Sequence, residues 1–241
     1  MHSYWGEAMH IGVIGATGGI GSRVVTEALD RGHQVTAFSR DASKIKESRE
    51  NVIWKNIDVL DAGSVAAALP GLDVLISGFQ PGNAAKDIAD TVARSIADPT
   101  VYATAARTLL KALESHPRTR LIVIGGAGSL EIEPGLVRAD SDDLLHEALD
   151  AIGLPREYAA AVRGHRDALN VLRTSNRLWT YLSPAEDIAP GERTARFRIG
   201  TDQPVLDADG RSRISMEDAA VALIDEAELS RFVQRRFTIG Y

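Results

Sequence analysis

Three glycines at three-residue steps, near the start of the chain, have the spacing that points most directly to chemistry. A short apolar run ends at Gly15, Gly18 and Gly21 follow, and a helical pattern begins behind them. Amides are free at a helix N-terminus, the helix dipole is positive there, and a missing Cβ lets a ligand approach the backbone closely. A strand that turns through glycines into a helix therefore predicts a diphosphate site. The alternative is a tight turn that binds nothing.

The end of the next expected strand, residues 33–40, indicates which dinucleotide would bind. At this tip of a dinucleotide fold an acidic residue binds the 2′-hydroxyl of the adenosine ribose, whereas an arginine accommodates a 2′-phosphate. The strand ends in Ser39 and Arg40, Asp41 comes one residue later, and Lys44 is within reach as a second cation. The pattern predicts NADP(H) in preference to NAD(H). The alternative for Arg40 is a solvated surface charge.

Two further strands, residues 51–57 and 72–78, end in residues suited to line the same site. Ligands of open α/β sheets bind outside the carboxyl ends of the strands. We therefore expect Asp58 to accept a hydrogen bond from an adenine amino group and Val59 to pack on the ring. Ser77 and Gly78 are small enough for the backbone to run beside the cofactor. Asp58 or Asp61 could instead cap a helix.

The fifth and sixth expected strands predict the nicotinamide side of the site. The fifth begins at residue 120, is almost continuously apolar, as a doubly covered central strand should be, and stops in Gly125-Gly-Ala-Gly-Ser129. Its glycines, with Gly126 among them, would bring the backbone and the Ser129 hydroxyl close to the nicotinamide. The sixth, residues 178–184, ends in Ser183 and Pro184.

A helix opened by Pro155 and running to about Arg173 carries two candidate acids, Tyr158 and His165, on one apolar stripe. A free tyrosine has a pKa of about 10 and is a poor acid at neutral pH. An unperturbed imidazole titrates near pH 6.5, so His165 could take its place. The alternative for His165 is a packed, hydrogen-bonded core histidine. With Ser129, these two residues are the catalytic candidates.

The chain as a whole has 241 residues, of which 44% are hydrophobic and 25% charged, with a net charge of −6. This is ordinary globular composition, and the acidic balance argues against a nucleic-acid partner. Because there is no cysteine, no disulfide, thiol nucleophile or thiolate metal site is possible, and we expect no metal. No apolar run is long enough to span a membrane. Residues 1–8 lack a signal-peptide pattern, so we expect a cytoplasmic protein in which they are an N-terminal extension.

The elements that position these residues alternate between strands and helices, which predicts an α/β fold of the Rossmann type with a doubly wound, mostly parallel sheet. We expect a single NAD(P)-binding domain over residues 9–241, with a small substrate-side subdomain at about 184–235. Residues 130–143 look like an acidic loop, and residues 194–200 alternate like an exposed strand. The expected helices cover residues 19–31, 41–50, 84–97, 101–115, 155–173 and 217–228.

Seven motifs together resemble an atypical short-chain dehydrogenase/reductase. More narrowly, they are similar to the bacterial NADH-flavin reductase group, which is related to biliverdin reductase B and NmrA-like proteins. The motifs are Gly15-Ala-Thr-Gly-Gly-Ile-Gly21, Ser39-Arg40, Asp58-Val-Leu-Asp61, Gly125-Gly-Ala-Gly-Ser-Leu130, Trp179-Thr-Tyr-Leu-Ser-Pro184, Pro190-Gly-Glu-Arg-Thr194 and Asp209-Gly-Arg-Ser-Arg-Ile-Ser215. The resemblance implies a Rossmann fold that binds NADP(H) and reduces a flavin or a small carbonyl compound.

One departure from the ordinary members concerns the acid. They use a tyrosine and a lysine four residues later, and the lysine lowers the pKa of the tyrosine. Here Tyr158 is followed by Val162, which puts tyrosine-driven carbonyl chemistry in doubt. Flavin reduction needs less from the protein, because hydride moves directly between stacked rings.

Three functions remain open on this basis. The first is an NADP(H)-dependent oxidoreductase acting on a flavin or a small carbonyl or quinone-like acceptor, as a monomer or homodimer. The second is an NmrA-like sensor that binds the dinucleotide without turnover. The third is a sugar-nucleotide epimerase or dehydratase. The predicted cofactor-binding residues are Gly15, Thr17, Gly18, Gly19, Ile20, Gly21, Ser39, Arg40, Lys44, Asp58, Val59, Ser77, Gly78, Gly126, Ser183 and Pro184.

Overall fold

A computed structural model describes residues 7–40, 51–81 and 87–241 of the chain. Its centre is an eight-stranded sheet in the order β10-β12-β8-β5-β4-β1-β2-β3, in which β10 alone runs antiparallel to its neighbour. The strands are β1 His10–Ile14, β2 Gln34–Ser39, β3 Val52–Asn56, β4 Val74–Ser77, β5 Arg120–Ile124, β8 Trp179–Ser183, β10 Arg198–Gly200 and β12 Arg235–Gly240. The mostly parallel α/β sheet predicted from the sequence is confirmed.

The register of the central strands brings their carboxyl ends to one edge. Ile14 of β1 pairs with both Phe38 of β2 and Ser77 of β4, and Ile124 of β5 pairs with Leu182 of β8. β1 is followed by β2 on one side and by β4 on the other, so the direction of winding reverses between β1 and β4. In open α/β sheets ligands bind outside the carboxyl ends at such a reversal.

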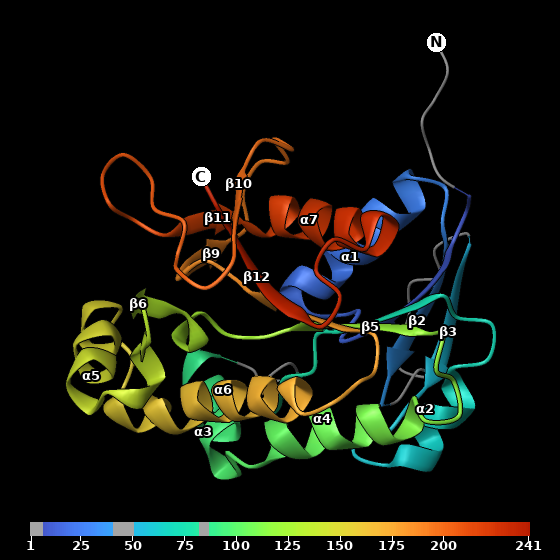
Figure 1. Cartoon of the computed structure of the whole chain (residues 1–241), viewed down its shortest axis with the longest axis horizontal. Coiled ribbons are helices and arrows are strands. Elements are labelled where there is room, and N and C mark those ends of the chain that lie inside the picture. Colours follow the sequence, from blue (N-terminus) through green and yellow to red (C-terminus); the bar gives the residue numbers. More distant parts are fainter. Residues whose placement is uncertain (1–6, 41–50, 82–86) are drawn as a thin grey trace.

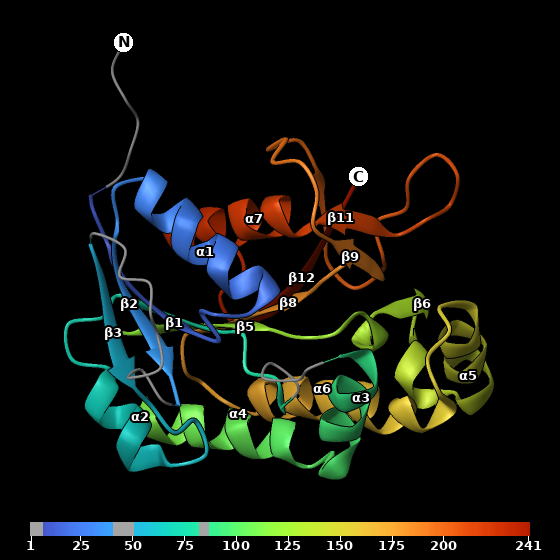
Figure 2. The same ribbon diagram turned by 180° about the vertical axis from the view of Figure 1, so that it is seen from behind.

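Helices cover both faces of the sheet (Figures 1 and 2). One face carries α1 Gly19–Asp30 and α7 Met216–Leu229, packed side by side. The other carries α2 Ala62–Ala68, α4 Val101–Ala112 and α6 Ala159–Arg173. Each helix layer buries its own hydrophobic core against the sheet. Two more helices, α3 Ile88–Ala97 and α5 Asp142–Ala151, lie at the carboxyl-edge side of this second layer.

Short elements connect these layers at the carboxyl edge. They are the single turns η3 Ala127–Ser129, η4 Arg138–Asp140 and η5 Arg156–Tyr158, the hairpin of β6 Glu131–Glu133 and β7 Leu136–Val137, and the two-stranded sheet of β9 Asp187–Ala189 and β11 Arg213–Ser215. The β9–β11 sheet is separate from the eight-stranded sheet. In contrast, β12 is a strand of the eight-stranded sheet, and α7 is one of the helices that cover it.

Most predicted elements are present, and their ends follow from local chemistry. Gly32, expected to close the first helix, has φ +84°, which glycine adopts without strain. Pro155 precedes η5, which continues into α6 as expected. Asp61, one of the two candidate caps, accepts a hydrogen bond from Gly63 N at 2.8 Å and begins α2. The short helix expected over residues 41–50 lies outside the described residues. So do residues 84–86, the first three residues of the helix expected over residues 84–97.

Two expectations were wrong. Residues 130–143 are not a plain loop: they fold into the β6–β7 hairpin and η4, and Ser141 then caps α5 by accepting from Leu144 N. Of residues 194–200 only Arg198–Gly200 form a strand. The Thr194 hydroxyl and the Ala195 amide both donate to Asp218, and Ala195 takes a φ of +53°, which bends the backbone out of an extended course.

Candidate functional site

The glycine turn between β1 and α1 has the geometry of an anion site. Gly15 has φ +79°, and its carbonyl accepts a hydrogen bond from Gly18 N at 2.9 Å, which closes the turn. Gly18 is the N-cap of α1 and offers no side chain to the amides of the first turn. A Cβ on Gly21 would lie 2.1 Å from the Gly15 oxygen, so this glycine lets the helix pack against the turn. The amides and the helix dipole are therefore left to attract an anion.

Two cavities meet at this turn. The first, named here the β5-side cavity, has a volume of about 250 Å³ and is lined by Gly15, Gly18, Gly19, Ile20, Gly21, Gly78, Phe79, Gln80, Ile124, Gly125, His165, Pro184, Ile188 and Met216. The second, the β2-side cavity, has a volume of about 410 Å³ and is lined by Ile14, Gly15, Thr17, Phe38, Ser39, Arg40, Ile57, Asp58, Val59, Leu60, Phe79, Gln80, Pro81, Arg94, Ala97, Asp98 and Val101. They share Gly15, Phe79 and Gln80, so together they form a trough with the glycine turn in its middle.

This trough gathers twelve of the sixteen predicted cofactor residues. Lys44 lies outside the described residues. The other three, Ser77, Gly126 and Ser183, line neither cavity. Ser77 and Ser183 are buried inside their strands, and a Cβ on Gly126 would lie 3.3 Å from the His165 side chain. The three described residues that fail to reach the trough are thus small residues, two at the buried ends of strands and Gly126 in the turn after β5.

The β2-side cavity is lined by the charged residues that were expected at the ends of the second and third strands. Arg40 is exposed at the tip of β2 and lines the β2-side cavity. Asp58 faces the same cavity, and its Oδ1 accepts a hydrogen bond from Leu60 N at 3.0 Å, which orders the turn after β3. Its backbone amide donates to the Ser64 hydroxyl at 2.9 Å, so the loop is fixed to α2.

Ser129, a candidate catalytic residue, has its hydroxyl turned inward. It is 2% exposed, donates to Gly126 O at 2.8 Å and lies 2.9 Å from the Ser183 hydroxyl. Its carbonyl accepts from Arg236, a buried residue of β12. The side chain therefore holds the turn that follows β5, and it lines neither cavity.

His165 does line the β5-side cavity, but as a neutral ring. Its ring packs on Tyr102 of α4 with 4.2 Å between centroids and a tilt of 46°. Burial lowers the pKa of His165 to about 4. An imidazole with that pKa is unprotonated at neutral pH, so it can donate or accept a hydrogen bond but carries no ready acidic proton.

Tyr158 lies between the helices at the carboxyl edge. Burial raises its pKa above the ordinary value and outweighs the opposite influence of the nearby polar side chains of Ser95 and Gln80. The position of the missing lysine is filled: a Cβ on Gly128 would lie 2.1 Å from Cγ1 of Val162, so valine packs tightly against the turn that contains Ser129. A tyrosine with a raised pKa, and with no cation beside it in the described part of the chain, is a weak proton donor.

Several lining residues were not predicted from the sequence. Phe79, Gln80 and Pro81 directly follow the fourth strand, and that position was a usable signal. Ile188 and Met216 come from the β9–β11 sheet and the start of α7, far along the chain. Met216 covers Gly19, where a Cβ would lie 2.9 Å from its sulfur. Nothing in the local pattern of either residue indicates this placement, because α1 and α7 meet only through the tertiary fold.

Two motifs that carried the family resemblance serve as scaffold. Arg193 of the Pro190–Thr194 motif binds both carboxylate oxygens of buried Glu27, at 2.7 and 2.8 Å. In the second motif Arg213 pairs with Asp207 at 2.7 Å, next to the β9–β11 sheet. Both motifs therefore hold the segment that carries Ile188 against the cavity.

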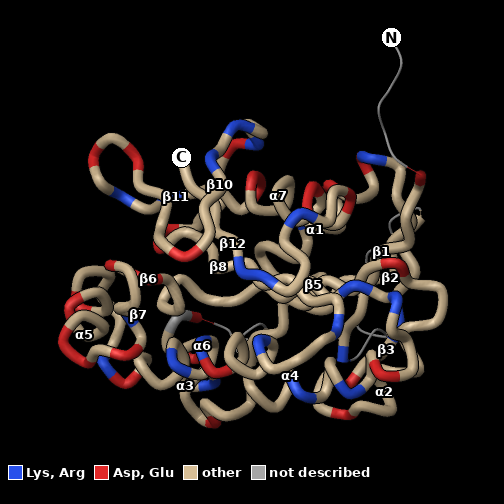
Figure 3. The backbone as a smooth tube through the Cα atoms, in the orientation of Figure 1, with Lys and Arg blue, Asp and Glu red and all other residues tan. Residues whose placement is uncertain are grey.

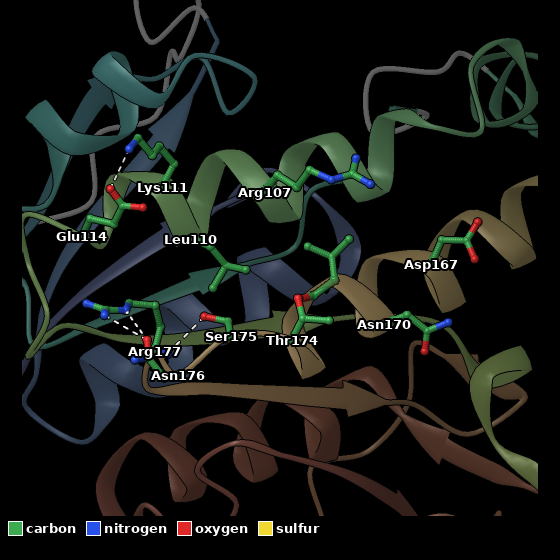
Figure 4. A pocket seen from close by; sticks show the side chains of 11 residues that line it. Arg107, Leu110, Lys111, Glu114, Asp167, Asn170, Thr174, Ser175, Asn176 and Arg177 are labelled. Carbon is green, nitrogen blue, oxygen red and sulfur yellow. Dashed lines mark hydrogen bonds and ion pairs between the residues drawn. The ribbon is translucent and has the colours of Figure 1, made fainter.

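A further hollow, about 1060 Å³ and so larger than either cavity of the trough, lies elsewhere. It is an open groove between the C-terminal halves of α4 and α6 (Figure 4). Its charges are mixed, with Lys111 paired to Glu114 at 2.6 Å, and Arg107 and Asp167 along its rim. It shares no residue with the trough, so its size does not make it the cofactor site.

A membrane span requires a long, apolar helix, and none of the described helices has both the length and the apolar character to cross a bilayer.

Comparisons with known proteins agree with this geometry. The model of the family described as NAD(P)H-binding matches residues 15–227. A “putative exported protein” of Burkholderia pseudomallei is 38% identical, with a TM-score of 0.79 over 97% of this chain and 100% of that chain. A “putative epimerase” of Bacteroides thetaiotaomicron is 35% identical, with a TM-score of 0.78 over 98% of both chains.

A third solved structure is similar over its whole length. It is a “putative NADH-flavin reductase” of Streptococcus pneumoniae, 29% identical, with a TM-score of 0.77 over 97% of this chain and 99% of that chain. Together, the glycine turn, the trough at the carboxyl edge and the family match show that this chain belongs to the NAD(P)H-binding family, as an atypical short-chain dehydrogenase/reductase-like member.

Proposed function

We propose that the protein is an NADP(H)-dependent oxidoreductase that passes hydride to a flavin or to a small carbonyl or quinone-like acceptor. The observation that carries the proposal is the glycine turn, whose uncapped helix N-terminus lies between two cavities. One cavity for an adenosine and one for a nicotinamide, joined at a diphosphate site, match the three parts of a dinucleotide.

The residues of the trough suit the cofactor. The first-turn amides of α1 would hold the diphosphate, and Arg40 would hold the 2′-phosphate that distinguishes NADP from NAD. Asp58 and Val59 would hold the adenine. NADPH, when bound, supplies the hydride. The protein binds and orients the two reacting rings in the β5-side cavity, where His165 and Gln80 provide hydrogen bonds and the apolar walls limit the access of water.

A flavin or a quinone-like acceptor fits the character of this cavity. Among the described residues that line it, none carries a full charge at neutral pH, since His165 is neutral. Tyr158 and His165 are both weak proton donors here. A reaction between stacked rings needs no side-chain acid in the same step, whereas carbonyl reduction usually does.

The second candidate is a regulator that binds NADP without turnover. It is favoured by one observation: Val162, which packs against Gly128, stands where ordinary members have the lysine that lowers the pKa of the tyrosine. Both candidates require the same trough, so binding of the cofactor does not separate them.

Turnover separates them. The purified protein is mixed with NADPH and, in turn, riboflavin, 1,4-naphthoquinone and benzaldehyde, and the absorbance at 340 nm is followed under anaerobic conditions. The enzyme proposal expects acceptor-dependent loss of NADPH that disappears in Gly18→Val. NADPH binding without oxidation by any acceptor would support the regulator instead. Failure to bind NADPH would reject both.

The proposal includes a cytoplasmic location, where NADPH is available, and a small-molecule substrate, with the protein as a monomer or homodimer. The lack of cysteine suits a protein that needs no disulfide. Fractionation of cells tests the location, and the relative of Burkholderia pseudomallei named as exported makes that test worthwhile.

A further inference from the structure

The β2-side cavity is walled from two directions. The tips of β2 and β3 supply one wall, with Arg40, and the segment from α3 to the start of α4 supplies another, with Arg94 and Asp98. Arg94 lies far from β2 in the sequence, on a helix that the family motifs do not include. Two guanidinium groups from different layers of the fold therefore line one cavity of about 410 Å³.

Both arginines keep donors free within the described part of the chain. Arg94 uses Nε to bind Asp90 Oδ1 at 2.8 Å, one turn earlier on α3, and no further bond of its guanidinium is formed there. This i,i+4 pair fixes the direction of the side chain and leaves both η nitrogens unused. Arg40 forms no hydrogen bond to any described residue.

The acids of the cavity do not use up these donors. Asp58 Oδ1 accepts from Leu60 N, and Asp98 Oδ1 accepts from the Thr100 amide at 3.0 Å and from its hydroxyl at 2.6 Å. Each carboxylate thus serves its own turn. The cavity is left with two cations, Arg94 held by Asp90 and Arg40 exposed, whose unused N–H groups suit a phosphate monoester, because planar guanidinium groups bind phosphate oxygens in pairs.

We propose that Arg94 is a further cation for the 2′-phosphate of the cofactor, so that Arg40 and Arg94 both contact this group between β2 and α3. The proposal rests on the proposed function, because it assumes that NADP(H) occupies the trough. It makes α3 part of the choice between NADP and NAD, a choice that the sequence pattern assigned to the β2 tip alone.

The competing explanation is that Arg94 serves only its helix. Its side chain is 41% exposed, and exposed i,i+4 ion pairs stabilise helices weakly. A residue with that role would change the affinities for NADP and NAD equally, or change neither. The 2′-phosphate role changes their ratio, and this is the quantity to measure.

The experiment compares Arg94→Gln, Arg94→Lys and the control Arg107→Gln by calorimetry with NADP⁺ and NAD⁺. Arg107 lies on α4 at the outer groove of Figure 4 and lines neither cavity of the trough. We expect Arg94→Gln to weaken NADP⁺ binding about tenfold, the lower end for a hydrogen bond to a charged group. NAD⁺ binding should stay within about twofold, and Arg107→Gln should match the wild type in both.

Two fragments isolate the adenosine end. Adenosine 2′,5′-bisphosphate carries the 2′-phosphate and adenosine 5′-monophosphate lacks it, so the ratio of their affinities reports this one group. Arg94→Gln should lower that ratio about tenfold. Arg94→Lys keeps the positive charge but loses the paired N–H donors of the guanidinium, so its ratio should lie between those of the wild type and Arg94→Gln. An unchanged ratio in Arg94→Gln would overturn the proposal even if Arg40→Ala lost NADP⁺. If the wild type bound none of the four nucleotides, the proposed function itself would fail.

Discussion

Arg40 stands at the tip of β2, exposed and without a hydrogen bond to the described residues, where the proposed function needs a cation. We expect Arg40→Ala to weaken NADP binding by about 1.5–3 kcal/mol, the range for a hydrogen bond to a charged group. NAD lacks the 2′-phosphate, so its affinity should hardly change. Calorimetry with both nucleotides measures the difference. Equal affinities for NADP and NAD in the wild-type protein would show that the β2 tip does not select the cofactor.

His165 illustrates how surroundings decide what a residue type can do. Sequence reasoning gave it a pKa near 6.5, whereas burial against Tyr102 lowers the pKa to about 4. We expect His165→Gln to keep more than about a tenth of the wild-type turnover, since loss of a general acid typically costs ~10²–10⁴-fold. Steady-state kinetics with the best acceptor test this. A thousandfold fall with NADPH affinity intact would identify His165 as the acid and favour a carbonyl substrate.

The same lowered pKa makes stability depend on pH. As pH falls below about 6.5, His165 takes up a proton in the unfolded chain first, and in the folded protein only near pH 4. The unfolded state therefore binds more protons between these two pH values. As a result, the free energy of unfolding decreases as the pH is lowered. Complete protonation of His165 lowers the free energy of unfolding by about 3 kcal/mol. Urea unfolding at pH 7.5 and 4.5 should show a smaller pH dependence in His165→Gln than in the wild type.

At the scale of elements, the glycine turn contains glycines with two different duties. Gly18 has φ −78° and ψ 171°, a backbone conformation open to any residue, so Gly18→Val should fold. Its branched side chain would occupy the approach to the helix amides and abolish binding of NADP. Gly21→Ala should instead unfold more easily, by about 2 kcal/mol or more, because the new Cβ would lie 2.1 Å from the Gly15 oxygen. Calorimetry of both variants measures cofactor binding, and thermal melts measure stability. Unaltered NADP affinity in folded Gly18→Val would show that the glycine turn is not the diphosphate site.

How far the sequence predicts the site also depends on elements. The ends of strands can be predicted because apolar runs stop at the carboxyl edge, and Arg40, Asp58 and Gly78, which were predicted in this way, line the trough. Ser183 ends β8 and Ser129 ends the turn that follows β5, but their hydroxyls face each other and not the cavities, which the sequence pattern does not reveal. Met216 could not be found at all, since its place depends on α1 and α7 packing together.

The C-terminal third shows the same limit for whole segments. The helix and closing strand were expected from pattern, and their integration into the main layers follows from long-range pairing of β12 with β8. The loop of residues 130–143 was misread because its strands have only two or three residues, too few to show alternation. The substrate side of the molecule, at about 184–235, stays a prediction, supported by Ile188 and Met216 at the cavity wall.

At the scale of the whole molecule, ion pairs join the segments that build the trough. On one face of the sheet acidic residues of α7 meet arginines of α1, as the red and blue segments of Figure 3 indicate. Arg31, which follows the last residue of α1, binds Asp225 at 2.7 Å and Glu228 at 2.8 Å. Glu27 extends this network to the loop before β10 through Arg193. The helix that carries the glycine turn is thus tied to both the C-terminal helix and the cavity wall.

Glu27 is the centre of this network and gives it a pH dependence. Its carboxylate is 4% exposed and binds Arg31 at 2.8 Å and Arg193 at 2.7 Å. Burial alone would raise the pKa of Glu27, but the hydrogen bonds and charges of the two arginines outweigh it and lower the pKa. A carboxylate with a lowered pKa stabilises the fold above its unfolded pKa, and this contribution is lost as pH falls through the folded value.

We therefore expect Glu27→Gln to lower the free energy of unfolding at pH 7 by about 3 kcal/mol, because Arg31 and Arg193 lose a buried partner. Arg193→Gln is the matched control: its side chain is 52% exposed, so removing it should cost about 1 kcal/mol or less. Urea unfolding at pH 7 and pH 3 tests both variants. The gap between wild type and Glu27→Gln should narrow at pH 3, because below the ordinary pKa of a glutamate the unfolded wild-type chain takes up a proton more readily than the folded protein, in which the pKa of Glu27 is lowered. A gap of the same size at both pH values would mean that Glu27 acts through packing alone and that the ion pairs do not hold α1 to the cavity wall.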